Sequence, residues 1–346
     1  MPWILALALA MAAHVASAQP APSADDCLTC HAEPIDIALA DGTTRTLRVH
    51  GDDLMTSVHA TKATCVDCHP DAKDIPHAER TFASTRQFTV AQSEQCRSCH
   101  FSDYRRTLDS VHADAVGRGD LTAPVCVDCH GSHTMQKPNT PRTRVAETCA
   151  RCHGGVAATY AKSVHGQDVA KNMTDVPTCV DCHRSHDIGG PKQAGWRTST
   201  PDICGRCHAD AARMQKYGLS TDVLKTYVAD FHGKTASLQH KSSDGPKPDA
   251  KFVAVCSDCH GTHDVTRADA ESSPVLKANL AKTCRKCHQN ASDSFPDSWL
   301  SHYEPSWSRT PAVYGVKMAY SLFIPFIIGG LVLQMLLHIW RMAVNR

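Results

Sequence analysis

Cysteine and histidine are the residues of this sequence whose spacing can do chemistry. All 18 cysteines fall into nine copies of one pattern, Cys-x-x-Cys-His. On one helical turn, residues i, i+3 and i+4 share a face, so two thiols and one imidazole point the same way. Two thioether bonds to a porphyrin and one axial ligand to its iron need this arrangement, which is typical of covalent c-type haem attachment. The cysteine pairs are Cys27 and Cys30, Cys65 and Cys68, Cys96 and Cys99, Cys126 and Cys129, Cys149 and Cys152, Cys179 and Cys182, Cys204 and Cys207, Cys256 and Cys259, and Cys284 and Cys287, and the histidines that follow are His31, His69, His100, His130, His153, His183, His208, His260 and His288.

Other uses of paired cysteines fit this pattern less well. Exported proteins oxidise cysteines into disulfide frameworks, and C-x-x-C pairs also build zinc ribbons. Neither requires a histidine directly after the second cysteine, which is present in all nine copies. No βαβ pattern surrounds any copy, which disfavours thioredoxin-like redox chemistry. The sequence therefore predicts nine covalent haem c groups.

Nine further histidines stand at regular places between the motifs. Motifs of type A begin at residues 27, 96, 149, 204 and 284, and motifs of type B, which read C-[VS]-D-C-H, begin at 65, 126, 179 and 256. Because there is one further histidine for each motif, we predict that these are the second axial ligands, with two imidazoles on every iron. After A motifs they are His59, His112, His165, His232 and His302, and after B motifs they are His77, His133, His186 and His263. His77 and His232 depart most from the repeat, and His50 is an alternative to His59 or His77.

Two observations bear on the ligands and their potentials. The methionines of the central region, Met55, Met135, Met173 and Met214, keep no fixed offset from any motif. Methionine ligation raises the reduction potential of a haem, so histidine on both sides implies low potentials. We expect His240, like His50 if it is not a ligand, to lie at the surface or to contact a haem propionate.

Charge and composition limit the class of protein. The chain has 36 Lys and Arg against 35 Asp and Glu, which gives no basic footprint for nucleic acid. Aromatic residues make up only 6% of it, too few for a conventional core beside each porphyrin. We therefore expect a mainly α-helical, irregular and elongated fold of tandem two-haem modules, with minimal strand content. The haem propionates would make the exported part acidic, so a soluble partner would dock through a basic patch.

Apolar segments lie near both ends of the sequence. Residues 1–18 end in Ala-Ser-Ala after an apolar run and read as a secretory signal peptide, with an uncleaved anchor as the alternative. Residues 318–340 contain no charged group, and we predict a transmembrane helix over 313–341 and a cytoplasmic tail over 342–346. Lys317 on one side and Arg341 and Arg346 on the other orient the bulk of the chain toward the periplasm under the positive-inside rule. The expected location is the inner (cytoplasmic) membrane, with a single pass.

The exported part divides at one polar, Gly- and Pro-containing segment. We predict a multihaem region over 19–232 with haems 1–7, an insertion or hinge over 233–251, and a membrane-proximal region over 252–312 with haems 8 and 9. The short distance between the last motif and the transmembrane segment places haem 9 near the membrane surface. Trp299, Tyr303, Trp307 and Tyr314 fit an aromatic belt there.

At its motifs the sequence resembles the multihaem cytochrome c superfamily, in particular proteins built of tandem doubled CxxCH modules such as the class III and small three-haem cytochromes. The resemblance covers residues 27–302. It implies closely stacked haems that act as an electron wire in a mostly helical, irregular fold. The chain is also similar to the membrane-anchored tetrahaem quinol dehydrogenases, although their anchor is N-terminal and the one predicted here is C-terminal.

These features favour an electron carrier over an enzyme. We expect a membrane-anchored carrier between a quinone-linked membrane partner and periplasmic redox proteins. Pro325, Gly329, Gln334 and His338 in the apolar segment favour packing against an integral-membrane quinol-oxidising or b-type cytochrome subunit, for which His338 is a candidate b-haem ligand. The alternative is an oxidoreductase, a multihaem nitrite, hydroxylamine or tetrathionate reductase with one open haem site. Every motif keeps its histidine and has a second histidine to match, so we predict no catalytic residue. A structural haem filament fits the signal peptide and anchor poorly.

Overall fold

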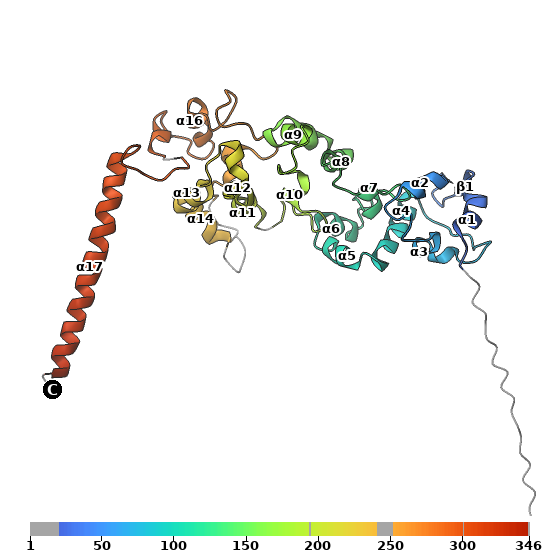
Figure 1. Ribbon diagram of the computed structural model, residues 1–346, viewed down its shortest axis with the longest axis horizontal. Coiled ribbons are helices and arrows are strands. Elements are labelled where there is room, and N and C mark those ends of the chain that lie inside the picture. Colours follow the sequence, from blue (N-terminus) through green and yellow to red (C-terminus); the bar gives the residue numbers. More distant parts are fainter. Residues whose placement is uncertain (1–20, 194, 241–251, 300, 345–346) are drawn as a thin grey trace, which may run out of the picture. The chain divides into compact units, whose positions relative to one another are not determined.

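The computed structural model describes residues 21–193, 195–240, 252–299 and 301–344 of the chain (Figure 1). The expected signal peptide lies outside the described residues, as does the second part of the expected hinge. The fold is mainly helical with long irregular connections, and the described residues contain one two-stranded sheet. The expectation of a mainly helical, irregular fold with little strand is confirmed for the described residues.

The chain forms two compact units. The first comprises residues 1–144 with 185–188, and the second comprises 145–184 with 189–346. The positions 232 and 252 that bound the expected hinge both lie inside the second unit, and its residues 233–240 belong to a helix.

Short helices follow one another along the first unit. Between the first two of them lies an antiparallel hairpin in which Ile35 is opposite Leu47, closed by a turn at Gly42 with a φ of 81°. The elements are α1 (Ala24–His31), β1 (Ile35–Ala38), β2 (Thr44–Leu47), α2 (Gly51–Thr56), α3 (Cys65–Cys68), η1 (Pro70–Ala72), α4 (Thr85–Ser93), η2 (Glu94–Ser98), α5 (Phe101–Thr107), α6 (Val111–Gly117) and α7 (Cys126–His130).

The second unit has longer helices and the main hydrophobic cluster. Tyr227, Ala236, Val253 and Val255 are buried together, and the Tyr227 hydroxyl donates a 2.9 Å hydrogen bond to the Ala254 carbonyl. The elements are α8 (Thr143–Lys162, its first two residues in the first unit), α9 (Val164–Ala170), α10 (Cys179–His183), α11 (Trp196–His208), α12 (Ala211–Met214), η3 (Gln215–Tyr217), α13 (Val223–Ala229), α14 (Phe231–His240), α15 (Cys256–His260), α16 (Lys277–Arg285), η4 (Phe295–Ser298) and α17 (Pro311–Val344).

Helix α17 is the long red helix of Figure 1, and it contains the segment expected to span a membrane. Among the described residues it is the one helix long and apolar enough to do so. Its large side chains, such as Phe326 and Leu322, are more than two-thirds exposed in the absence of lipid. A helix of this length and composition is compatible with a single-pass membrane anchor.

Candidate functional site

The B motifs each form a short helix that begins at their first cysteine: α3, α7, α10 and α15. The A motifs take more varied places. Those of α1 and α11 end their helices, and the motif inside α8 lies at a kink where His153 has non-helical dihedral angles. In all nine motifs the two cysteines are partly or fully exposed.

The histidines that the sequence singled out meet in pairs, each made of one motif histidine and one histidine from between the motifs. Eight such pairs have ring centroids 5.9 to 6.4 Å apart. They are His31 with His77, His100 with His59, His69 with His133, His130 with His186, His208 with His165, His183 with His263, His288 with His232, and His260 with His302.

The spacing within these pairs fits a metal ion between the rings. A metal–imidazole bond is about 2.0–2.1 Å long, and the ligand nitrogen lies about 1 Å from its own ring centre, so two imidazoles on opposite sides of one ion have centroids about 6 Å apart. The angle between ring planes ranges from 5° for His31 and His77 to 60° for His59 and His100. Direct ring packing would favour particular angles, whereas axial ligands rotate freely about the metal–nitrogen bond. The pairs therefore suit the two axial positions of a haem iron.

Hydrogen bonds at the second ring nitrogen orient two of the motif histidines. The Nδ1 of His183 lies 2.9 Å from the Gly189 carbonyl oxygen, and that of His69 lies 3.2 Å from the Gln92 side-chain oxygen. Each oxygen accepts a hydrogen bond from the Nδ1–H group, which leaves the lone pair on Nε2. This is the tautomer that a metal-binding imidazole needs.

Burial favours the neutral form of several of the paired imidazoles. Desolvation lowers the pKa of His165, His208, His260 and His263, and nearby histidines add to the effect at His165, His260 and His263. A neutral imidazole is the form that binds a metal, so no proton has to be displaced at neutral pH.

Glycine allows a close backbone approach beside two of the second histidines. A Cβ at Gly166, next to His165, would lie 2.1 Å from the Tyr160 carbonyl oxygen, and one at Gly233, next to His232, would lie 2.0 Å from that of Tyr227. Both contacts are far shorter than any real Cβ approach, so only glycine fits here. The preceding histidine is thereby held at the start of its helix.

The pairs follow a register that the sequence did not reveal. Three of the paired histidines that follow an A motif meet the next A motif along the chain: His59 meets His100, His165 meets His208, and His232 meets His288. A histidine that follows a B motif meets the previous B motif, as His133 does with His69. At the two ends no further motif of the same type exists, and His77 and His302 instead meet their neighbouring motifs at His31 and His260.

The remaining histidines fall outside these eight pairs. His112 and His153 belong to different units. His50 lies at the N-cap of α2, and His240 lies 3.3 Å from the Thr198 hydroxyl and 3.9 Å from Asp202. His77 and His232, which depart most from the sequence repeat, both occupy a pair.

Cysteine contacts place consecutive motifs side by side. From each A motif to the following B motif, the first cysteines share a side-chain hydrogen bond: Cys27 with Cys65, Cys96 with Cys126, Cys149 with Cys179, and Cys204 with Cys256.

Between a B motif and the following A motif, the second cysteine of the B motif is the one that lies near a cysteine of the A motif. Burial and then the nearby Cys204 raise the pKa of Cys182 to about 11, and burial, Asp258 and Cys284 do the same for Cys259. Burial, Asp67 and Cys99 raise the pKa of Cys68. Motifs 1 to 4 are thus contiguous in the first unit, and motifs 5 to 9 in the second.

The comparison with protein families agrees with this arrangement. Residues 9–113 match the model described as outer membrane cytochrome MtrC/MtrF-like, domains II/IV, and residues 119–209 match the cytochrome c3 model. The chain is a multihaem c-type cytochrome. Comparison with curated proteins and with solved structures gave no significant match. Covalent haem c and electron transfer follow for this cytochrome from the two families.

The aspartate of the B motifs has a structural role in the cytochrome that sequence reasoning missed. In all four copies its carboxylate accepts a 2.7 Å hydrogen bond from the backbone NH of the residue before the first cysteine. This contact caps the start of the short helix that carries the thiols and the imidazole. The signal in the sequence was the fixed third position of Asp67, Asp128, Asp181 and Asp258.

In two of these caps, an arginine from an earlier helix also binds the aspartate. Arg86 of α4 donates hydrogen bonds of 3.0 and 2.8 Å to the two carboxylate oxygens of Asp128, and another to the Ala123 carbonyl. Arg197 of α11 donates a hydrogen bond to one carboxylate oxygen of Asp258 and another to the Val253 carbonyl. Its guanidinium lies 3.6 Å from the centre of the Phe252 ring. Each arginine therefore ties an A helix to the following B motif.

Replacing Arg86 with alanine is expected to destabilise the cytochrome by about 1.5–3 kcal/mol, the usual range for hydrogen bonds to a charged group. Thermal unfolding followed by circular dichroism measures the change. The matched control is Arg267→Ala, because Arg267 and Asp269 form an exposed pair with 75% and 70% of their side chains accessible, which is worth about 0–1 kcal/mol. Equal losses in the two variants would refute this role of Arg86.

Proposed function

We propose that this cytochrome carries nine haem c groups, each with two histidine ligands, and moves electrons between a quinone-linked partner in the inner membrane and redox proteins in the periplasm. The observation that supports it best is the set of eight imidazole pairs with a spacing of about 6 Å. When bound, the haems supply one-electron redox chemistry at low potential, because both axial ligands are imidazoles.

The chain's own residues would attach the haems, orient them and fix their sequence along the chain. Each thiol pair would hold one porphyrin, and each histidine pair its iron, in the register described above. Asp128 and Arg86, with their counterparts Asp258 and Arg197, would keep neighbouring motifs at a fixed separation. The contacts between consecutive cysteines support electron transfer in the order of the motifs within each unit.

The membrane-proximal residues support entry or exit of electrons at the ninth motif. Phe295 lies 5.1 Å from the ring of His288 in the ninth motif. Trp299 lies edge-on at 5.8 Å to the ring of His302, which pairs with His260 of the neighbouring eighth motif. Closer to α17, the Arg309 guanidinium lies over Tyr303, and Trp307 meets Tyr314 edge-on. Aromatic and cationic side chains of this kind gather at the boundary between lipid and water.

Helix α17 would anchor the protein and receive the membrane partner. Gln334, His338 and Arg341 lie on one shallow groove of this helix. Burying an amide and an imidazole in lipid is costly unless a partner satisfies them, which favours an integral-membrane quinol-oxidising or b-type cytochrome subunit on this side. His338 is the residue through which the chain would share a b-haem with that subunit.

Electron paramagnetic resonance of the oxidised full-length protein tests the proposal. We expect low-spin ferric signals alone, because every iron would have two imidazole ligands. A substantial high-spin signal would contradict the ligation and favour a reductase with one open site. A second arm follows quinol-driven reduction in native membranes. Normal reduction and unchanged haem content in His338→Ala would remove His338 as a b-haem ligand.

A further inference from the structure

A strained backbone conformation marks one residue of the B repeat. The residue after the motif histidine has a φ of 78° at Gly131 and 82° at Gly261, with ψ near 180° in both. The third copy has Arg184 at this place, with a φ of 66° and a ψ of 177°. This region of backbone space is essentially restricted to glycine, so an arginine here carries a conformational penalty.

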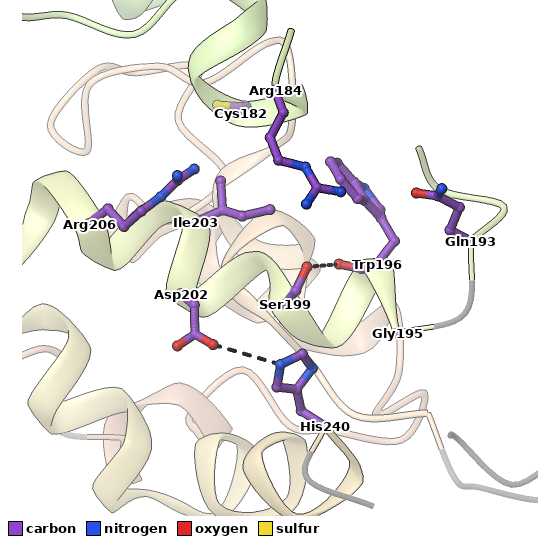
Figure 2. Close-up of a pocket in the computed structure, with 10 residues that line it drawn as sticks. All are labelled: Cys182, Arg184, Gln193, Gly195, Trp196, Ser199, Asp202, Ile203, Arg206 and His240. Atoms are coloured by element: carbon purple, nitrogen blue, oxygen red, sulfur yellow. Dashed lines mark hydrogen bonds and ion pairs between the residues drawn. The ribbon is translucent and has the colours of Figure 1, made fainter. Parts of the chain in front are cut away.

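The side chain of Arg184 lines a cavity. A cavity of about 410 Å³ in the second unit is bordered by Cys182, Arg184, Trp196, Ile203, Arg206 and His240. Figure 2 shows Arg184 extending from the end of α10 toward Trp196, with Arg206 on the other side of Ile203. Cys182 is the second thiol of motif 6, so the cavity lies directly beside a haem attachment point.

The charges of the lining favour an anion. Two guanidinium groups and one carboxylate border the cavity, and that carboxylate, of Asp202, lies 3.9 Å from His240 (Figure 2). Arg206 is also fixed by donating a 2.8 Å hydrogen bond to the Asp181 carbonyl. Trp196 packs against the His183 ring, with centroids 5.0 Å apart and planes at 12°. The cavity thus joins a cationic wall to the axial ligand of motif 6.

We propose that Arg184 and Arg206 form a carboxylate-binding pair that holds a haem propionate in this cavity and raises the reduction potential of the haem of motif 6 above those of motifs 4 and 8. This inference rests on the haem attachment in the proposed function. A guanidinium stabilises the reduced, less positive haem, and planar N–H donors suit a carboxylate. The haem of motif 6 would then hold an electron more strongly than the haem of motif 8 in the same unit.

The test uses the Arg184→Gly variant of the full-length protein, because two of the three other B copies have glycine at this place, Gly131 and Gly261. We expect a shift of about tenfold in the redox equilibrium of one haem toward the oxidised form, equivalent to about 59 mV lower, the size of one unit charge acting at about 10 Å through an effective dielectric of 20. The Tm of Arg184→Gly should rise although the reduction potential falls, because glycine relieves the strained φ.

Two matched variants separate charge from strain. Arg184→Lys keeps both the charge and the strain, so its potentials should stay near those of the wild type with no gain in Tm. Arg206→Gln removes a charge without touching the strained backbone, so one potential should fall with no rise in Tm. A higher Tm with unchanged potentials in Arg184→Gly would overturn the proposal. So would a difference in potential between the wild type and Arg184→Gly that is seen only when acetate is added, because the cavity would then bind a free carboxylate and not a propionate. Absence of haem on motif 6 in wild-type protein, seen by mass spectrometry of its peptide, would instead defeat the proposed function.

Discussion

Replacing His165 with alanine is expected to turn one haem from low-spin to high-spin. His165 and His208 have ring centroids 6.4 Å apart, and burial lowers the pKa of both imidazoles. Under the proposed ligation, removal of one ring would leave the iron next to His208 with a single strong ligand. Electron paramagnetic resonance of the oxidised protein should then show a high-spin ferric signal from about one haem in nine.

Two further variants sharpen this test. His165→Met should keep the iron low-spin but raise its potential, since thioether ligation favours the reduced state. His240→Ala is the matched control, because His240 is a histidine of the same unit that contacts Thr198 instead of a motif histidine. If His165→Ala left the spectrum unchanged, the pairing of His165 with His208 as axial ligands would be wrong.

Removal of α17 is expected to release the protein from the membrane with its haem spectrum intact. The helix spans Pro311–Val344, and Trp307 with Tyr314 is the ring contact between it and the preceding segment among the described residues. A chain that ends at Thr310 should therefore move almost completely from the membrane fraction to the soluble fraction. Ultracentrifugation with haem-stained gels measures the distribution.

A shorter truncation provides the control. A chain that ends at Met342 keeps the apolar span and Arg341, and it should stay in the membrane fraction after washing with high salt. Membrane retention of the chain that ends at Thr310 would show that another part of the protein binds the membrane. Loss of haem absorbance in that chain would show that α17 also supports folding.

Much of the fold class was predictable because the haem motif is a covalent requirement. Two thiols and an imidazole at fixed spacing can be read from the sequence without any tertiary information, and Cys179, Cys182 and His183 accordingly share one helix. The second histidines were also recognisable as a set, because their number matches that of the motifs. Little sheet was expected from a chain with few aromatic and many motif residues, and one short hairpin is what the described residues contain.

The pairing register was not predictable, because equal spacing along a repeat makes several partners equivalent. His133 is near three motifs in sequence, and only the folded path brings it to His69. The Arg86–Asp128 contact was hidden for the same reason, since its partners are 42 residues apart. The boundary between the two compact units, after residue 144, falls inside helix α8. Nothing in the local composition marks this boundary.

The two-way register makes each repeat depend on its neighbours for a complete iron site. Histidines from A repeats reach forward and those from B repeats reach backward, so a single repeat cut out of the chain would leave irons without ligands at both cut ends. His77 and His302 turn to their immediate neighbours and close the two ends, as capping repeats close a solenoid. The number of haems in such an array would therefore be set by the position at which a histidine pairs with its neighbouring motif.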